Sequence, residues 1–149
     1  MTERSNSEIA EKLSSKRARI LLVLGIIFLA QQAAYFSDVS DLSRTVDHVK
    51  IAAWLVLSIA LLALLATGGG WFRSPEVRAL LNDESTREHR RRAYVYGFWA
   101  AMGTAIGLYA IDMFQPVSGH QAVHIIMTIA IGTALLNFAF LERRAHRNG

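Results

Sequence analysis

The chain has 149 residues, a formal net charge of +4 at pH 7, and hydrophobic residues at 52% of its positions against 19% charged residues. It contains no cysteine, which excludes disulfide bonds, cysteine-ligated zinc, iron–sulfur clusters and a thiol nucleophile. The apolar residues gather in four blocks, and the charged residues lie between these blocks. A soluble domain intersperses the two kinds so that each helix keeps a polar face, so this composition favours a membrane protein.

The first apolar block covers residues 18–36 and follows a polar leader at residues 1–17. A helix needs roughly 20 mostly apolar residues to cross the hydrocarbon core of a bilayer, and this block has about that length. The leader contains three acidic residues. The block also exceeds the roughly 7–15 apolar residues of a signal-peptide core. We therefore expect a retained transmembrane helix here rather than a cleaved signal.

The other three blocks are also long enough to span a bilayer, and none carries a charge near its centre. They cover residues 49–71, 93–114 and 121–141. Unpaired backbone groups are too costly in lipid, which favours a helix for each block. The sequence predicts an all-α polytopic membrane protein with four transmembrane helices in an antiparallel bundle. This domain covers residues 18–141, with a loop at 72–92, and a basic tail follows at 142–149.

Lysine and arginine residues lie mostly on one side of the predicted membrane. The leader through Arg19 holds five, the loop at 72–92 holds six and the tail holds three. The other two connections hold only Arg44 and Lys50. Because positively charged segments stay on the cytoplasmic side, we expect both termini and the loop in the cytoplasm.

The charged end of the loop runs directly into the third span. Ser85 and Glu88 form the S-x-x-E pattern of a capping box, which predicts where this helix begins. Glu88 also lies four residues before Arg92, the order that favours an ion pair on a helix. Arg90, Arg91 and Arg92 are expected to reach anionic lipid headgroups and to set the depth of the helix. A specific site for anionic lipid or a phosphorylated ligand and a docking surface for a cytosolic partner are the alternatives.

Five ionisable residues fall near the predicted outer interface, namely Asp47, His48, Asp112, His120 and His124. An ionisable residue at membrane depth is by default a candidate functional residue, because burying it in lipid is costly. His120 and His124 share one helix face, and with Asp112 and His48 they are candidate ligands of a divalent metal. Two histidines from different helices are instead candidate axial ligands of haem. The alternative is that these side chains are solvated or cap helices, and that the protein has no cofactor.

Small residues form two stripes on the third span. One stripe contains Gly97, Ala101, Ala105 and Asp112, and the other contains Gly103 and Gly107. Small residues allow a second helix to approach closely. We expect one stripe to pack inside the protein, with Asp112 pointing at a neighbouring helix, and the other stripe to serve self-association.

The segment "NDESTREHRRRAYVYGFW" resembles a stretch of a family of uncharacterised small four-helix bacterial inner-membrane proteins. In that family an Asp-Glu-x-Thr turn leads through Arg-Ala into a Phe-Trp helix start. The matching residues here are Asp83, Glu84, Thr86, Arg92, Ala93, Phe98 and Trp99. The resemblance covers about twenty residues and implies a multi-pass protein of the bacterial cytoplasmic membrane, with no established activity.

These features favour a non-enzymatic scaffold, accessory subunit or oligomeric membrane module. Its expected partners are the lipid bilayer and either a second copy of the chain or a subunit of a membrane complex. The basic pI of about 9.9 reflects the lysine and arginine residues that set the topology, and it does not indicate nucleic-acid binding. One alternative is a haem- or metal-binding redox or sensor protein. Another is a small transporter or channel component, although the centres of the second and third spans offer only Ser58 and Thr104 as polar residues.

Overall fold

The computed structural model describes residues 2–37, 45–68 and 84–148. Over these residues the chain is all-α and forms four helices. They are α1 at Thr2–Ser37, α2 at Thr45–Thr67, α4 at Glu84–Asp112 and α5 at Gly119–Asn148. Residues 69–83, which hold the predicted end of the second span and much of the predicted loop, lie outside the described part of the chain.

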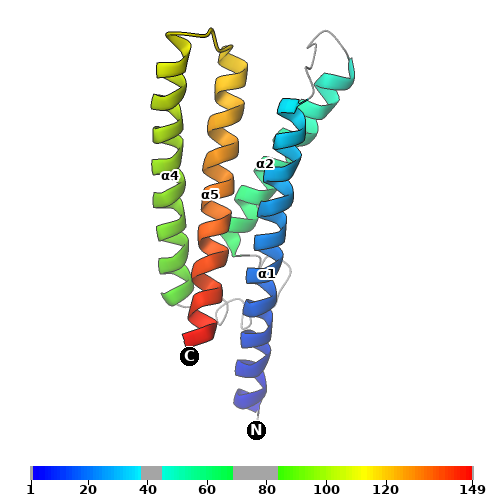
Figure 1. Cartoon of the computed structure of the whole chain (residues 1–149). Helices are drawn as coiled ribbons and strands as arrows, with labels where there is room; N and C mark the ends of the chain where they lie inside the picture. Colours follow the sequence, from blue (N-terminus) through cyan, green and yellow to red (C-terminus); the bar gives the residue numbers. More distant parts are fainter. Residues whose placement is uncertain (1, 38–44, 69–83, 149) are drawn as a thin grey trace.

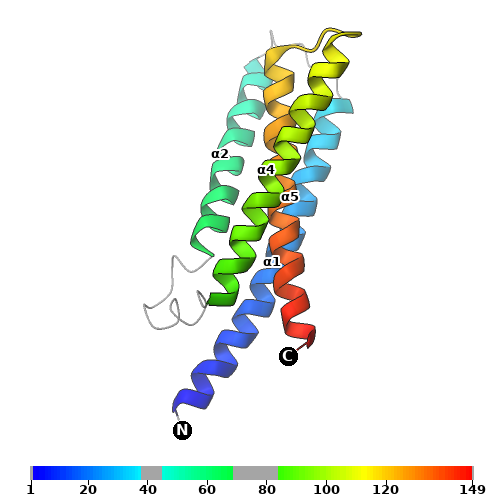
Figure 2. The same ribbon diagram turned by 90° about the vertical axis from the view of Figure 1, so that its left-hand side faces the viewer.

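Helix α5 is the helix against which the others pack. It makes most of its contacts with α4 and α1 and fewer with α2. The chain runs up α1, down α2, up α4 and down α5 in Figure 1, so both termini lie at the same end of the molecule. Figure 2 shows α5 between α1 and α2 in the upper part of the view. We call the end where α2 and α5 finish the termini end.

Three stretches of helix are long and apolar enough to cross a membrane, namely His48–Thr67, Glu84–Asp112 and Gly119–Ala145. Helix α1 contains the predicted first span but is not among these three. Little of α4 is buried inside the protein, and its exposed side chains include Phe98, Trp99 and Ile106. Soluble monomers rarely expose such large apolar patches, whereas a lipid-facing helix does. The fold therefore supports a multi-pass membrane protein.

The helix ends differ from the predicted span boundaries. Helix α1 begins at Thr2 and α5 continues to Asn148, so the predicted leader and tail are largely helical. Helix α2 ends at Thr67, before the predicted boundary at Trp71. Gly68 follows with a φ of 64°, in the left-handed region. A glycine in this conformation is a common helix terminator because other residues are strained there.

Two capping contacts connect α4 to α5. The Val117 amide donates a hydrogen bond of 2.8 Å to Oδ1 of Asp112. Ser118 and Gln121 then form a reciprocal capping box, with N–O distances of 3.2 and 3.4 Å. Asp112 is exposed and does not point at a neighbouring helix, contrary to the expectation. Since α4 ends at Asp112, its carboxylate meets the turn that follows.

The large buried side chains come from α1, α2 and α5. They are Leu21, Phe28, Leu65, Leu135 and Phe138. Lipid tails are as apolar as these side chains, so helices associate in a membrane through close packing and polar contacts. Helix α1 lies very close to α5 at Gly132, where a Cβ atom would stand 2.6 Å from Cδ2 of Leu29.

The two small-residue stripes of α4 have different surroundings. At Gly97 an added Cβ would lie 3.1 Å from the Ala130 carbonyl oxygen and 3.1 Å from the Ala134 Cβ, both on α5. At Gly103 and Gly107 it would meet nothing within 4 Å among the described residues. The Gly97 face is therefore packed against α5, and the other face is open.

We expect Gly97→Val to lower the free energy of unfolding by about 1–3 kcal/mol, the usual cost of overpacking. The atoms it meets belong to a helix backbone and a Cβ, so they cannot rotate away. Gly103→Val is the matched control on the same helix, and we expect it to change stability by less than about 0.5 kcal/mol. Denaturant unfolding measures both, in detergent micelles at a dilution where each micelle holds one copy of the protein. Equal losses would contradict the packing of α4 on α5.

Candidate functional site

A buried carboxylate lies at the termini end, where side chains from three helices meet. Glu142 on α5 is 3% exposed, and its Oε2 lies 2.5 Å from Nη2 of Arg17 on α1. Its other oxygen, Oε1, accepts a hydrogen bond of 3.1 Å from the Thr86 hydroxyl on α4 and lies 3.3 Å from Nδ1 of His89. We call Arg17, Thr86, His89 and Glu142 the Glu142 cluster.

Two arginines extend this cluster to the end of α2. Arg17 donates from Nη1 to the Gly68 carbonyl oxygen at 3.1 Å. Arg90 on α4 donates to the Ala66 carbonyl oxygen. The last carbonyls of a helix have no partner within it, and they carry the negative end of the helix dipole. Guanidinium groups from α1 and α4 therefore cap α2, so the cluster connects all four helices.

The three consecutive arginines of α4 have different environments. Arg90 turns towards α2, whereas the side chains of Arg91 and Arg92 are 82% and 59% exposed. Arg92 forms the predicted ion pair with Glu88, with Nε 2.8 Å from Oε1. Helix α4 begins at Glu84, one residue before Ser85, so Ser85 lies inside the first turn rather than at the predicted cap.

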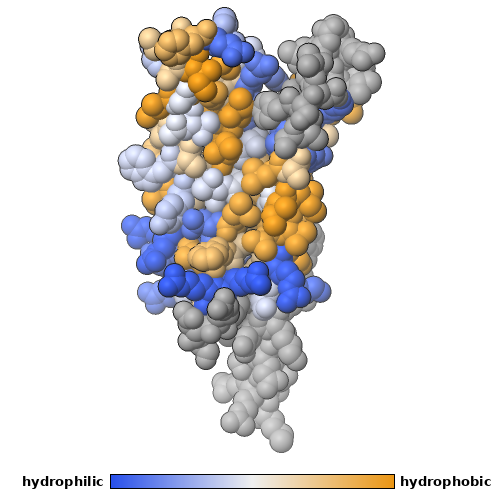
Figure 3. Space-filling view, viewed as in Figure 1, coloured by the Kyte–Doolittle hydropathy of each residue, from blue (hydrophilic) through white to orange (hydrophobic). Residues whose placement is uncertain are grey.

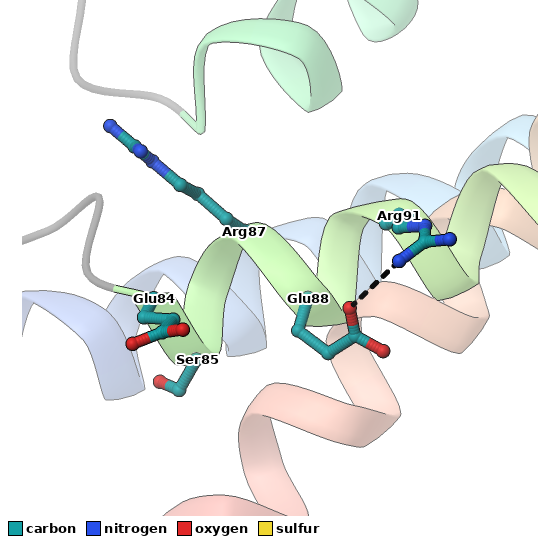
Figure 4. Close-up of a pocket in the computed structure, with 5 residues that line it drawn as sticks. All are labelled: Glu84, Ser85, Arg87, Glu88 and Arg91. Atoms are coloured by element: carbon teal, nitrogen blue, oxygen red, sulfur yellow. Dashed lines mark ion pairs between the residues drawn. The ribbon is translucent and has the colours of Figure 1, made fainter.

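A shallow hollow of about 670 Å³ lies beside these residues at the start of α4. It is lined by Glu84, Ser85, Arg87, Glu88 and Arg91. Figure 4 shows that Arg87 points away from Glu84 and Ser85, while Glu88 pairs with Arg91. The side chains do not converge on one point, and acidic and basic groups alternate. The hollow lacks the converging polar groups of a small-molecule pocket.

Figure 3 shows where hydrophilic residues gather on one face of the molecule. A band of them crosses the termini end, and apolar residues occupy much of the face above this band. Arginine side chains at such a boundary extend their charged groups to water and headgroups while their stems cover apolar surface. This distribution suits a helix end at a membrane surface.

The predicted histidine and aspartate ligands have different environments. His48 and His120 are exposed, as is Asp112, whereas His124 is only 3% exposed. Over the residues that the structure describes, no three histidine, aspartate or glutamate side chains are grouped to hold a metal ion. A metal or haem site stays a prediction, which an absorption spectrum and metal analysis of the purified protein would test.

His124 belongs instead to a set of buried polar side chains on α1, α2 and α5. We call it the interior polar cluster, and its members are Gln32, Trp54, Ser58, His124 and Thr128. The His124 ring donates from Nε2 to the Gln32 amide oxygen. The Trp54 indole stacks on the same ring, with centroids 4.0 Å apart and planes inclined by 23°. The histidine therefore joins α1 and α2 to α5.

Sequence reasoning missed the Glu142 cluster because Arg17 and Glu142 lie at the predicted boundaries of the membrane domain. They fall in the polar leader and the basic tail, which the charge pattern predicts to be cytoplasmic. The sequence did contain one signal. A base lies just before the first predicted span and an acid lies just after the fourth, on the same predicted side of the membrane. Opposite charges at matching membrane depth can pair inside a protein rather than face water.

The chain matches no protein-family model, no curated protein and no solved structure significantly. The resemblance of residues 82–99 to small bacterial inner-membrane proteins stays a prediction.

We expect Glu142→Gln to lower the free energy of unfolding by about 3–5 kcal/mol, because the Arg17 charge stays buried without this counter-ion. Glu88→Gln is the matched control, since it breaks the exposed pair with Arg92 and is expected to change little. Replacing both charges, as in Arg17→Met with Glu142→Leu, should restore most of the stability. Denaturant unfolding in detergent micelles compares the variants. Equal effects of the two glutamine variants would show that water solvates Glu142.

Proposed function

We propose that the protein is a non-enzymatic scaffold, accessory subunit or oligomeric module of a bacterial cytoplasmic membrane. It crosses the bilayer four times as an antiparallel bundle, and both termini are cytoplasmic. The observation that carries the proposal is the open small-residue face of α4. Gly103 and Gly107 meet no described side chain, while Gly97 on the other stripe packs against α5.

The charge distribution supports the topology. Both termini lie at one end of the molecule, as four crossings require (Figure 1). The basic leader and tail are at this end, and Arg91 and Arg92 are exposed near it. Such arginines interact with anionic lipid headgroups and keep their segment on the cytoplasmic side. The first span is the apolar stretch at 18–36, which lies within α1.

The open face of α4 supports lateral association. Glycines four residues apart allow two helix backbones to approach closely, and this contact gains van der Waals packing that lipid does not provide. Around them α4 exposes Trp99 and Ile106, which supply apolar contact area. A second copy of the chain is the simplest partner, because a symmetric contact needs only one surface.

Reporter fusions test the topology. We expect a fusion after Gly149 to report the cytoplasm and a fusion within residues 40–45 to report the outer side. The physical reason is the excess of lysine and arginine in the leader, the loop and the tail. A tail on the outer side would contradict the proposed orientation. Two fusions on the same side would mean that the chain between them crosses the membrane an even number of times.

Substitutions on α4 test the association. We expect Gly103→Ile together with Gly107→Ile to abolish or weaken self-association, because the side chains hold the second backbone away. The measurement is resonance energy transfer between labelled copies in lipid vesicles, over a range of protein-to-lipid ratios.

Met102→Ile is the control, because it places the same side chain at a neighbouring exposed position that is not on the glycine stripe. We expect it to leave energy transfer unchanged. Transfer that is absent from the unchanged protein would reject self-association. Transfer that survives the double substitution would place the contact on another surface.

A further inference from the structure

Three polar atoms of the interior polar cluster are buried without a partner. They are the Trp54 indole nitrogen Nε1, the Ser58 hydroxyl and the Thr128 hydroxyl, and none forms a hydrogen bond within the described part of the chain. Ser58 is 0% exposed and Thr128 is 3% exposed. More than nine in ten buried polar groups in proteins are hydrogen-bonded, and each exception calls for a physical explanation.

Two other hydroxyls in this protein show how a helix normally supplies a hydrogen-bond partner to such a group. Thr67 donates to the Ala63 carbonyl oxygen, and Thr104 donates to the Ala100 carbonyl oxygen, both at 2.7 Å. A serine or threonine in a helix can satisfy itself in this way on the carbonyl four residues earlier. Ser58 and Thr128 do not make this bond. Their hydroxyls are therefore available at the interface between helices.

The two hydroxyls also share a register. Trp54 on α2 stacks on His124 on α5, and these helices run in the same direction in Figures 1 and 2. Ser58 and Thr128 each lie four residues further along, on the same face as the stacked residue. The register puts two unpaired hydroxyls at one level, a turn below a stacked pair that includes the unpaired indole N–H.

We propose that this interface between α2 and α5 is an internal hydration site, at which water binds Trp54, Ser58 and Thr128. An indole N–H only donates, so its ligand must accept, and each hydroxyl both donates and accepts. Water meets all three needs. The cluster contains no acidic residue, lysine or arginine, so it offers no counter-ion to a charged ligand. Buried water with two to four polar partners is a regular part of protein interiors.

Helix α2 is the element that admits the water. The three polar atoms are enclosed by protein, so water reaches them only when the two helices separate. Among the described residues α2 makes the fewest contacts with the other helices. Two arginines hold its backbone carbonyls at Ala66 and Gly68, at the termini end. The stretch of α2 around Trp54 and Ser58 can therefore separate from α5 while this end stays in place.

The test uses a variant with Trp71→Phe and Trp99→Phe, in which Trp54 is the remaining tryptophan. It is reconstituted in vesicles of phosphatidylethanolamine and phosphatidylglycerol. We expect added Ser58→Ala and Thr128→Val to shift Trp54 emission to shorter wavelength, because removing the hydroxyls dries the site. Thr104→Val, whose hydroxyl is satisfied within its helix, is the control and should leave the emission unchanged.

A second measurement does not depend on substitutions in the cluster. In the same single-tryptophan protein, the Trp54 indole N–H should exchange with deuterium faster than the amides of the α5 core, as followed by nuclear magnetic resonance. Emission that is unchanged by the double substitution in a folded protein would overturn the proposal. Indole exchange as slow as that of the α5 core amides would also overturn it, because water would then not reach the indole N–H.

Discussion

The ion pair between Arg17 and Glu142 lies where all four helices meet. Arg17 reaches the end of α2 with one guanidinium nitrogen and Glu142 with the other. The same carboxylate accepts from Thr86 on α4. Removing one partner of a buried pair is costly because it leaves an uncompensated charge. The two side chains can meet only when these helices are in one register. The relative placement of the helices at the termini end depends on this constraint.

Above that end, the packing of small residues sets how close the helices lie. Gly132 brings α1 against α5, and Gly97 brings α4 against it. Helix α5 is thus the central helix, and α4 keeps a second face that contacts nothing in the described chain. In lipid the hydrophobic effect does not drive an apolar helix face to bury itself against protein. A glycine stripe therefore promotes association only with a helix whose shape packs closely against it. This selectivity is the physical basis of the proposed association.

Helix α2 combines a firm end with a loosely packed length. Two arginines hold its last carbonyls, while Trp54 and Ser58 contribute polar atoms without partners to the interface with α5. Unsatisfied polar groups destabilise a dry interface. Water between α2 and α5 would remove that penalty.

The sequence by itself determined the four helices and their approximate positions, because the length of an apolar run and the pairing of backbone groups are local properties. It also predicted the Glu88–Arg92 pair, whose partners are four residues apart. Only the tertiary structure decided that Arg17 meets Glu142, 125 residues away, and that His124 meets Gln32. Which helix lies beside which is set by packing and polar contacts, and apolar helix faces that look alike in a sequence do not encode it.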